Sequence, residues 1–174
     1  MDLASIHLAL RITAWISLVF FLWGFAAAAL ASLVPSQAAR WLAANRRNAV
    51  LAFAASHTAH LGLILTLAAK MGWAQFIHAF TWVTVIVGGG GFLLIYALAW
   101  KALRKRTRAT SGDSRLEAFA YYYLWGIFAL TYAGSSFRSG FYIPIGLVVL
   151  AALFLRLTAA WQSRRLAGVS PAPN

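Results

Sequence analysis

Five apolar segments, each long enough to cross a lipid bilayer as a helix, constrain this chain more than any other feature. They cover residues 12–34, 49–69, 76–100, 117–135 and 140–161. A hydrocarbon core of ~30 Å takes about 20 helical residues to cross, and backbone groups in lipid must be hydrogen-bonded within the protein. The segments therefore predict an all-α integral membrane protein, a bundle of about five transmembrane helices in a single domain over residues 1–174.

The composition agrees with a membrane location. The chain is 62% hydrophobic and 10% charged, whereas about a quarter of the residues in a soluble domain are charged. It has no cysteine, which excludes disulfides, zinc–thiolate sites, iron–sulfur clusters and thiol redox chemistry. The N-terminal sequence MDLASIHLAL carries Asp2 and lacks the basic region of a cleavable signal peptide, so we expect a retained first helix.

Basic residues gather in the loops at alternate ends of the predicted helices. Three arginines lie in residues 35–48, six basic residues lie in residues 101–115, and two more arginines follow residue 161. The opposite loops hold only Lys70 and Arg138. The positive-inside rule then places the N-terminus outside and the C-terminus inside, in a bacterial-type inner (cytoplasmic) membrane. Residues 162–174 are expected to form a flexible cytoplasmic tail.

The formal net charge of +12 bears on the binding partners. In a soluble protein such a charge would suggest nucleic acid. Here the basic residues flank apolar segments, where they are placed to contact anionic lipid head groups. We therefore expect a lipid bilayer as the partner and no nucleic acid.

Two histidines interrupt the second apolar segment, in the sequence ASHTAHLG. His57 and His60 are three residues apart, so they share one face of a helix. His60 is about eleven residues from the basic side, which places it near mid-membrane. An ionisable residue at that depth is a functional candidate. The alternative is a neutral histidine hydrogen-bonded to a neighbouring helix.

The third segment carries a second set of candidates. His78 lies near its start, and the run GGGG covers residues 88–91. Glycine lets another backbone or a flat ligand approach closely. Gly88 and Gly91 are therefore either helix-packing residues or one wall of a site for a planar cofactor.

Aromatic residues follow helical spacing in the fourth segment, in AYYYLWGIFALTYAGSSF. Tyr121, Trp125, Phe128 and Tyr132 fall on one stripe. The stripe is either a packing or lipid-facing surface, or a wall for a ring-shaped ligand to which Tyr132 would contribute.

Haem iron needs axial ligands, which are commonly imidazoles from facing helices. A pair drawn from His57, His60, His78 and His7 could supply them, with His60 and His78 as the first candidates for the metal. The acidic residues are only Asp2, Asp113 and Glu117. No carboxylate falls at mid-membrane, which argues against proton-coupled transport and carboxylate acid–base catalysis.

The segment RRNAVLAFAASHTAH, residues 46–60, resembles the start of the haem-bearing helix in the ferric-reductase-like membrane family. There an Arg-Arg pair precedes an apolar helix, and a haem-ligand histidine follows about thirteen residues after the second arginine; Arg46, Arg47 and His60 match. The resemblance covers about fifteen residues and implies haem b and transmembrane electron transfer. Members of the family place further ligand histidines on a later helix, where residues 115–134 contain none. A bis-histidine haem between the second and fourth segments is therefore not expected.

Three functions remain open from the sequence. The first is a small membrane haem-b protein that transfers electrons across or within the membrane. The second is a non-catalytic accessory subunit that packs in a larger respiratory or photosynthetic membrane complex. The third is a lipid- or isoprenoid-modifying membrane enzyme that uses the histidines.

Overall fold

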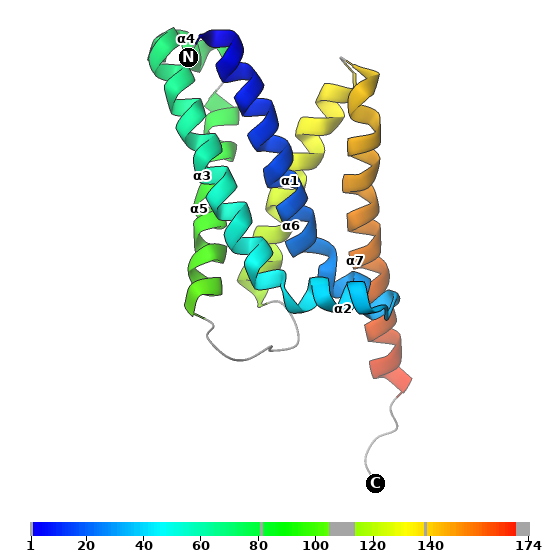
Figure 1. Ribbon diagram of the computed structural model, residues 1–174. Coiled ribbons are helices and arrows are strands. Elements are labelled where there is room, and N and C mark those ends of the chain that lie inside the picture. Colours follow the sequence, from blue (N-terminus) through cyan, green and yellow to red (C-terminus); the bar gives the residue numbers. More distant parts are fainter. Residues whose placement is uncertain (1, 81, 105–113, 138, 170–174) are drawn as a thin grey trace.

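The computed structural model describes residues 2–80, 82–104, 114–137 and 139–169 (Figure 1). These residues contain helices and no β-strand, which confirms the all-helical prediction. The elements are α1 (Leu3–Leu33), α2 (Gln37–Ala44), α3 (Arg46–Met71), α4 (Trp73–Ala79), α5 (Trp82–Arg104), α6 (Arg115–Ser136), the 3-10 helix η1 (Gly140–Tyr142) and α7 (Ile143–Val169).

Four stretches have the length and apolar composition of membrane spans. They are Leu3–Leu33, Arg46–Met71, Thr84–Arg104 and Gly140–Leu166. This agrees with the predicted helical membrane protein. The fifth long helix, α6, has 22 residues. It is less apolar because it carries Arg115, Glu117 and several aromatic residues with polar groups.

The helix boundaries depart from the predicted segments at both ends of the chain. The first helix begins at Leu3 instead of residue 12, because the Asp2 side chain accepts a hydrogen bond from the Ser5 backbone N–H at 2.7 Å and caps it. Hydrogen bonds from Ser5 also hold the pKa of Asp2 below its usual value. The last helix continues to Val169, so the expected flexible tail is helical over 162–169. Residues 170–174 lie outside the described part of the chain.

Two short helices differ from the predicted pattern: α2 lies where a loop was predicted, and α4 takes up the start of a predicted long helix. The region 35–48 contains α2, which begins because the Ser36 hydroxyl accepts the Ala39 N–H at 3.1 Å. The predicted helix 76–100 is divided into α4 and α5, since α4 ends at Ala79 and Phe80 is its C-cap residue. The division leaves His78 on a separate seven-residue helix.

The five long helices form a closed ring. Helix α1 packs on α3 and α7, α3 packs on α5, α5 packs on α6, and α6 packs on α7. Figure 1 shows α2 across one end of this ring, with α4 and the N-terminus at the other. We refer to these as the α2 end and the α4 end.

Aromatic side chains fill the ring toward the α2 end. Phe21 of α1 is 1% exposed, and its ring centroid lies 5.5 Å from that of Phe53 and 4.9 Å from that of Phe128. Tyr121 and Phe25 extend the same cluster. Burial of such large side chains stabilises the bundle, because each aromatic side chain buries about 150–250 Å² of its surface.

Two arginines join the helices around this aromatic cluster. The Arg46 Nε donates to the Gly24 carbonyl at 2.7 Å, and the Arg156 Nη1 donates to the Phe25 carbonyl at 2.9 Å. Their guanidinium groups lie 4.7 and 5.4 Å from the centroid of the Tyr121 ring. Helices α3 and α7 are thus tied to α1 and α6 by charged hydrogen bonds and cation–π contacts.

Candidate functional site

A cavity of about 180 Å³ lies inside the ring, beyond the aromatic cluster toward the α4 end. Five of the six predicted site residues line it: His57, His60, Gly88, Gly91 and Tyr132. The other lining residues are Ala14, Ile64, Phe92, Ile95, Leu124, Ile127, Phe128 and Thr131. The cavity therefore brings residues from α1, α3, α5 and α6 to one place.

His60 is held by a hydrogen bond from its helix to α1. Its Nδ1 lies 2.8 Å from the Thr13 hydroxyl, which in turn donates to the Ala9 carbonyl at 2.9 Å. The Thr13 hydroxyl also lies 3.1 Å from the Leu10 carbonyl. When its single proton goes to one of these carbonyls, the Thr13 oxygen accepts from His60 Nδ1–H. This geometry is compatible with the Nδ1–H tautomer, in which Nε2 keeps a lone pair. Metal-ligating histidines are typically oriented in this way by a partner on the second ring nitrogen.

His57 occupies the adjacent helical turn. Its ring centroid lies 5.4 Å from that of His60 and 4.8 Å from that of Phe92. Its Nδ1 is buried and has no hydrogen-bond partner among the described residues. A buried polar atom without a partner costs about 1–3 kcal/mol. His57 is therefore poorly explained as a simple packing residue.

The four-glycine run of α5 divides into two functions. A Cβ added at Gly91 would lie 2.9 Å from Ile127 Cδ1, and one added at Gly90 would lie 3.0 Å from the Tyr123 hydroxyl. These two glycines let α5 and α6 approach closely. A Cβ at Gly88 or Gly89 would meet nothing within 4 Å. Gly88 lines the cavity, so on this wall the backbone borders open space.

The aromatic stripe of α6 also divides. Tyr132, 4% exposed, and Phe128 line the cavity with ring centroids 6.4 Å apart. Tyr121 belongs instead to the aromatic cluster beside Arg46. Trp125 faces α7, where its Nε1 donates to the Val149 carbonyl at 2.9 Å. The predicted stripe therefore does not form one wall: its residues lie in the cavity, in the aromatic cluster and against α7.

The structure does not bring the remaining histidines to the cavity. His78 lies on α4 and His7 near the start of α1, and neither lines it. Among the residues that the structure describes, no three His, Cys, Asp or Glu side chains are grouped closely enough to hold a metal ion. A metal centre at the cavity would therefore depend on the His57 and His60 pair.

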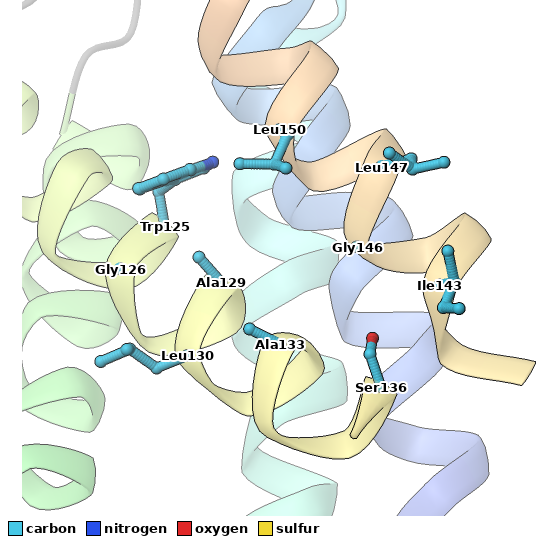
Figure 2. A pocket seen from close by; sticks show the side chains of 10 residues that line it. All are labelled: Trp125, Gly126, Ala129, Leu130, Ala133, Ser136, Ile143, Gly146, Leu147 and Leu150. Atoms are coloured by element: carbon cyan, nitrogen blue, oxygen red, sulfur yellow. The ribbon is translucent and has the colours of Figure 1, made fainter. Parts of the chain in front are cut away.

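A second, larger groove of about 420 Å³ lies between α6 and α7 (Figure 2). Small residues form much of its surface: Gly126, Ala129, Ala133 and Gly146. Its polar side chains are the Ser136 hydroxyl and the Trp125 indole, and no titratable residue lines it. The groove offers packing volume without reactive groups, so the smaller histidine cavity is the candidate site for chemistry.

The residues around the histidine cavity offer a donor group that suits a haem, but the cavity is too small to hold one as it stands. His60 Nε2 could serve as an axial ligand, and glycine and aromatic residues would form apolar walls for a planar ring. The volume of about 180 Å³ is smaller than the roughly 300–1,000 Å³ of sites for drug-sized ligands. A haem would therefore require the α5–α6 wall to move outward.

Thr13 was not singled out from the sequence, although a signal for it exists. Thr13 contacts His60, and one turn further along α1 the Ser17 hydroxyl contacts that of Ser56 at 3.0 Å. Each helix thus carries two polar residues four apart, as two antiparallel helices need to hydrogen-bond across an apolar interface. Matching these spacings identifies both pairs.

No protein-family model, curated protein or solved structure matches this chain. The candidate site therefore rests on its own geometry.

Proposed function

We propose that this chain is a small membrane haem-b protein in which His60 is the axial ligand of the iron. The observation that carries the proposal is the hydrogen bond between His60 Nδ1 and the Thr13 hydroxyl, which holds the ring of a residue that borders the cavity; in the Nδ1–H tautomer, Nε2 keeps a lone pair for the iron. The buried Nδ1 of His57 and the open face of Gly88 support a ligand in the same cavity. When bound, the haem supplies one-electron redox chemistry.

The proposal includes an orientation. All five long helices cross a bacterial-type cytoplasmic membrane, with the α4 end and the N-terminus outside and the α2 end inside. The exposed arginines near the α2 end support it, among them Arg40, Arg47, Arg164 and Arg165. These residues would contact anionic lipid head groups. Electrons would enter and leave through separate donor and acceptor molecules.

The experiment is a titration of haem-free protein in detergent with haemin, followed by absorption spectroscopy. Wild-type protein is expected to develop a Soret band that saturates, and the band is expected to be lost in His60→Ala. His78→Ala is the matched control, since His78 lies outside the cavity, and it should behave as wild type. Equal haem binding by wild type and His60→Ala would overturn the proposal.

The groove between α6 and α7 favours a second candidate, an accessory subunit of a larger membrane complex. Its small residues would accept a helix of a partner subunit, because such residues let helices approach closely in membranes. Gly146→Leu would then abolish co-migration with other subunits on native gels. Retention of the complex in this variant, or a protein that migrates alone before mutation, would count against this candidate.

A further inference from the structure

We infer that the histidine cavity binds one small neutral ring that carries a hydroxyl group, a molecule with the size and chemistry of a simple phenol. Its binding does not depend on the proposed function, since it concerns the haem-free protein with the cavity at its present size. Three features of the cavity support this ligand: its volume, its polar groups without partners, and its aromatic walls.

The first feature is the volume of the cavity, which is about 180 Å³. An apolar cavity of about 150 Å³ inside a protein accepts benzene. The histidine cavity therefore has room for a single six-membered ring with a small substituent, without any movement of the helices. Two linked rings would need more space than the cavity provides.

The second feature is a pair of polar side chains without hydrogen-bond partners. Neither ring nitrogen of His57 makes a hydrogen bond to a described residue, although Nδ1 is buried. The Tyr132 hydroxyl also makes none within the described part of the chain, and this side chain is 4% exposed. By contrast, the Thr131 hydroxyl donates to the Ile127 carbonyl at 2.8 Å. Because buried polar groups are normally hydrogen-bonded, we expect a ligand hydroxyl to pair with His57 or Tyr132.

The third feature is the aromatic surface around these two groups. The ring centroid of Phe92 lies 4.8 Å from that of His57, and the ring centroid of Phe128 lies 6.4 Å from that of Tyr132. These side chains all line the cavity. Aromatic rings attract one another in offset and tilted arrangements, whereas each water molecule in a cavity needs two to four polar partners. The walls therefore favour an aromatic ring over a cluster of water molecules.

Two neighbouring glycines of α5 allow the cavity to be filled by mutation. A Cβ added at Gly88 or Gly89 meets no atom within 4 Å, but Gly88 lines the cavity and Gly89 lies on the exposed side of the helix. Leucine at position 88 should take up space in the cavity. Leucine at position 89 is the matched control outside it.

The test is a titration of haem-free protein in detergent with para-fluorophenol, followed by fluorine NMR. Wild-type protein is expected to give a saturable signal change beyond the partition of the probe into protein-free micelles. Gly88→Leu should lose this saturable component, and Gly89→Leu should keep it. A fluorinated hydroxybiphenyl, which has two rings, should show partition into detergent only.

His57→Phe and Tyr132→Phe test the polar contact, because each variant keeps an aromatic ring and loses a hydrogen-bonding group. At least one of them should weaken para-fluorophenol binding by about tenfold, the value of a typical hydrogen bond. Binding of fluorobenzene, which has no hydroxyl, should be the same in wild type and both variants. This comparison separates a lost hydrogen bond from a damaged cavity.

Wild-type protein without a saturable component would overturn the inference, as would a component that Gly88→Leu retains. Unchanged para-fluorophenol affinity in both phenylalanine variants would overturn it as well, and so would saturable binding of the two-ring probe. No haem is present in these measurements, so their failure is distinct from a failure of the haemin titration that tests the proposed function.

Discussion

At the scale of single residues, the candidate site depends on a hydrogen bond between two helices. The Thr13 hydroxyl lies 2.8 Å from His60 Nδ1 and 2.9 Å from the Ala9 carbonyl oxygen. The bond restrains the rotation of the ring. A freely rotating histidine would present its lone pair in many directions and would lose more entropy on binding a metal.

Thr13→Val tests this orientation. Valine has a similar shape but cannot accept the Nδ1–H, so we expect haem affinity to fall by about 10–100-fold. The measurement is the haemin titration followed at the Soret band. Ser56→Ala is the control, because it removes the neighbouring bond to Ser17 on the same pair of helices. Equal losses in the two variants would show that helix packing, and not the orientation of His60, sets the affinity.

The sequence identified five residues that line the cavity but not how they are held. Spacing alone places His57 and His60 on one face, and glycine content alone marks α5 as a site of close approach. His78 was expected beside them because a continuous helix over 76–100 would carry it toward the bundle. The break at Phe80 separates α4 from α5. A local turn of this kind is decided by tertiary packing, which sequence periodicity does not contain.

At the scale of elements, the seam between α5 and α6 combines tight packing with an open wall. Gly90 and Gly91 lie against Tyr123 and Ile127, whereas Gly88 and Gly89 border open space. The Tyr123 hydroxyl donates to the Val87 carbonyl at 3.0 Å and adds a polar contact to this seam. Gly90 and Gly91 therefore act as helix-packing residues, while Gly88 and Gly91 also border the cavity.

Alanine substitutions distinguish the two pairs. In Gly91→Ala the new methyl group displaces Ile127, and we expect the protein to lose about 1 kcal/mol of stability through overpacking. Gly89→Ala should be neutral or slightly stabilising, because alanine favours a helix over glycine by about 1 kcal/mol. Thermal unfolding followed by circular dichroism measures both. A larger loss in Gly89→Ala than in Gly91→Ala would contradict the assignment.

At the scale of the whole molecule, a ring of five helices is filled by aromatic side chains toward the α2 end and holds the histidine cavity between these side chains and the α4 end. Phe21, Phe53 and Phe128 fill the first half, and the histidine cavity occupies the second. Arg46 and Arg156 tie the filled half together through the Gly24 and Phe25 carbonyls. The five apolar segments predicted the long helices well, since hydrophobic length is a local property. The closure of the ring and the two arginine contacts link residues far apart in sequence, and no local pattern contains them.

Replacement of Arg156 tests the closure of the ring. Arg156→Met removes the hydrogen bond to the Phe25 carbonyl and the contact with the Tyr121 ring. We expect a loss of about 2–3 kcal/mol, since hydrogen bonds to charged groups are worth ~1.5–3 kcal/mol. Arg164→Met removes an exposed charge of the same helix and should leave the melting temperature unchanged. Equal melting temperatures for the two variants would show that Arg156 does not hold α7 in the ring.

The absence of cysteine makes the proposed orientation directly measurable. Ser5→Cys and Ser163→Cys place single exposed thiols near the two ends of the described chain. With the N-terminus outside and the C-terminus inside, a membrane-impermeant maleimide labels the first variant in intact cells and the second only after lysis. The reverse pattern, or labelling of both in intact cells, would contradict the proposed topology.

The most direct measurement of the central claim is the absorption spectrum of the protein purified from haem-replete cells, before and after reduction. We predict a Soret band with the intensity of a single haem per chain, absent from His60→Ala and retained in His78→Ala. A folded, colourless wild-type protein would contradict it, as would a Soret band of equal intensity in His60→Ala.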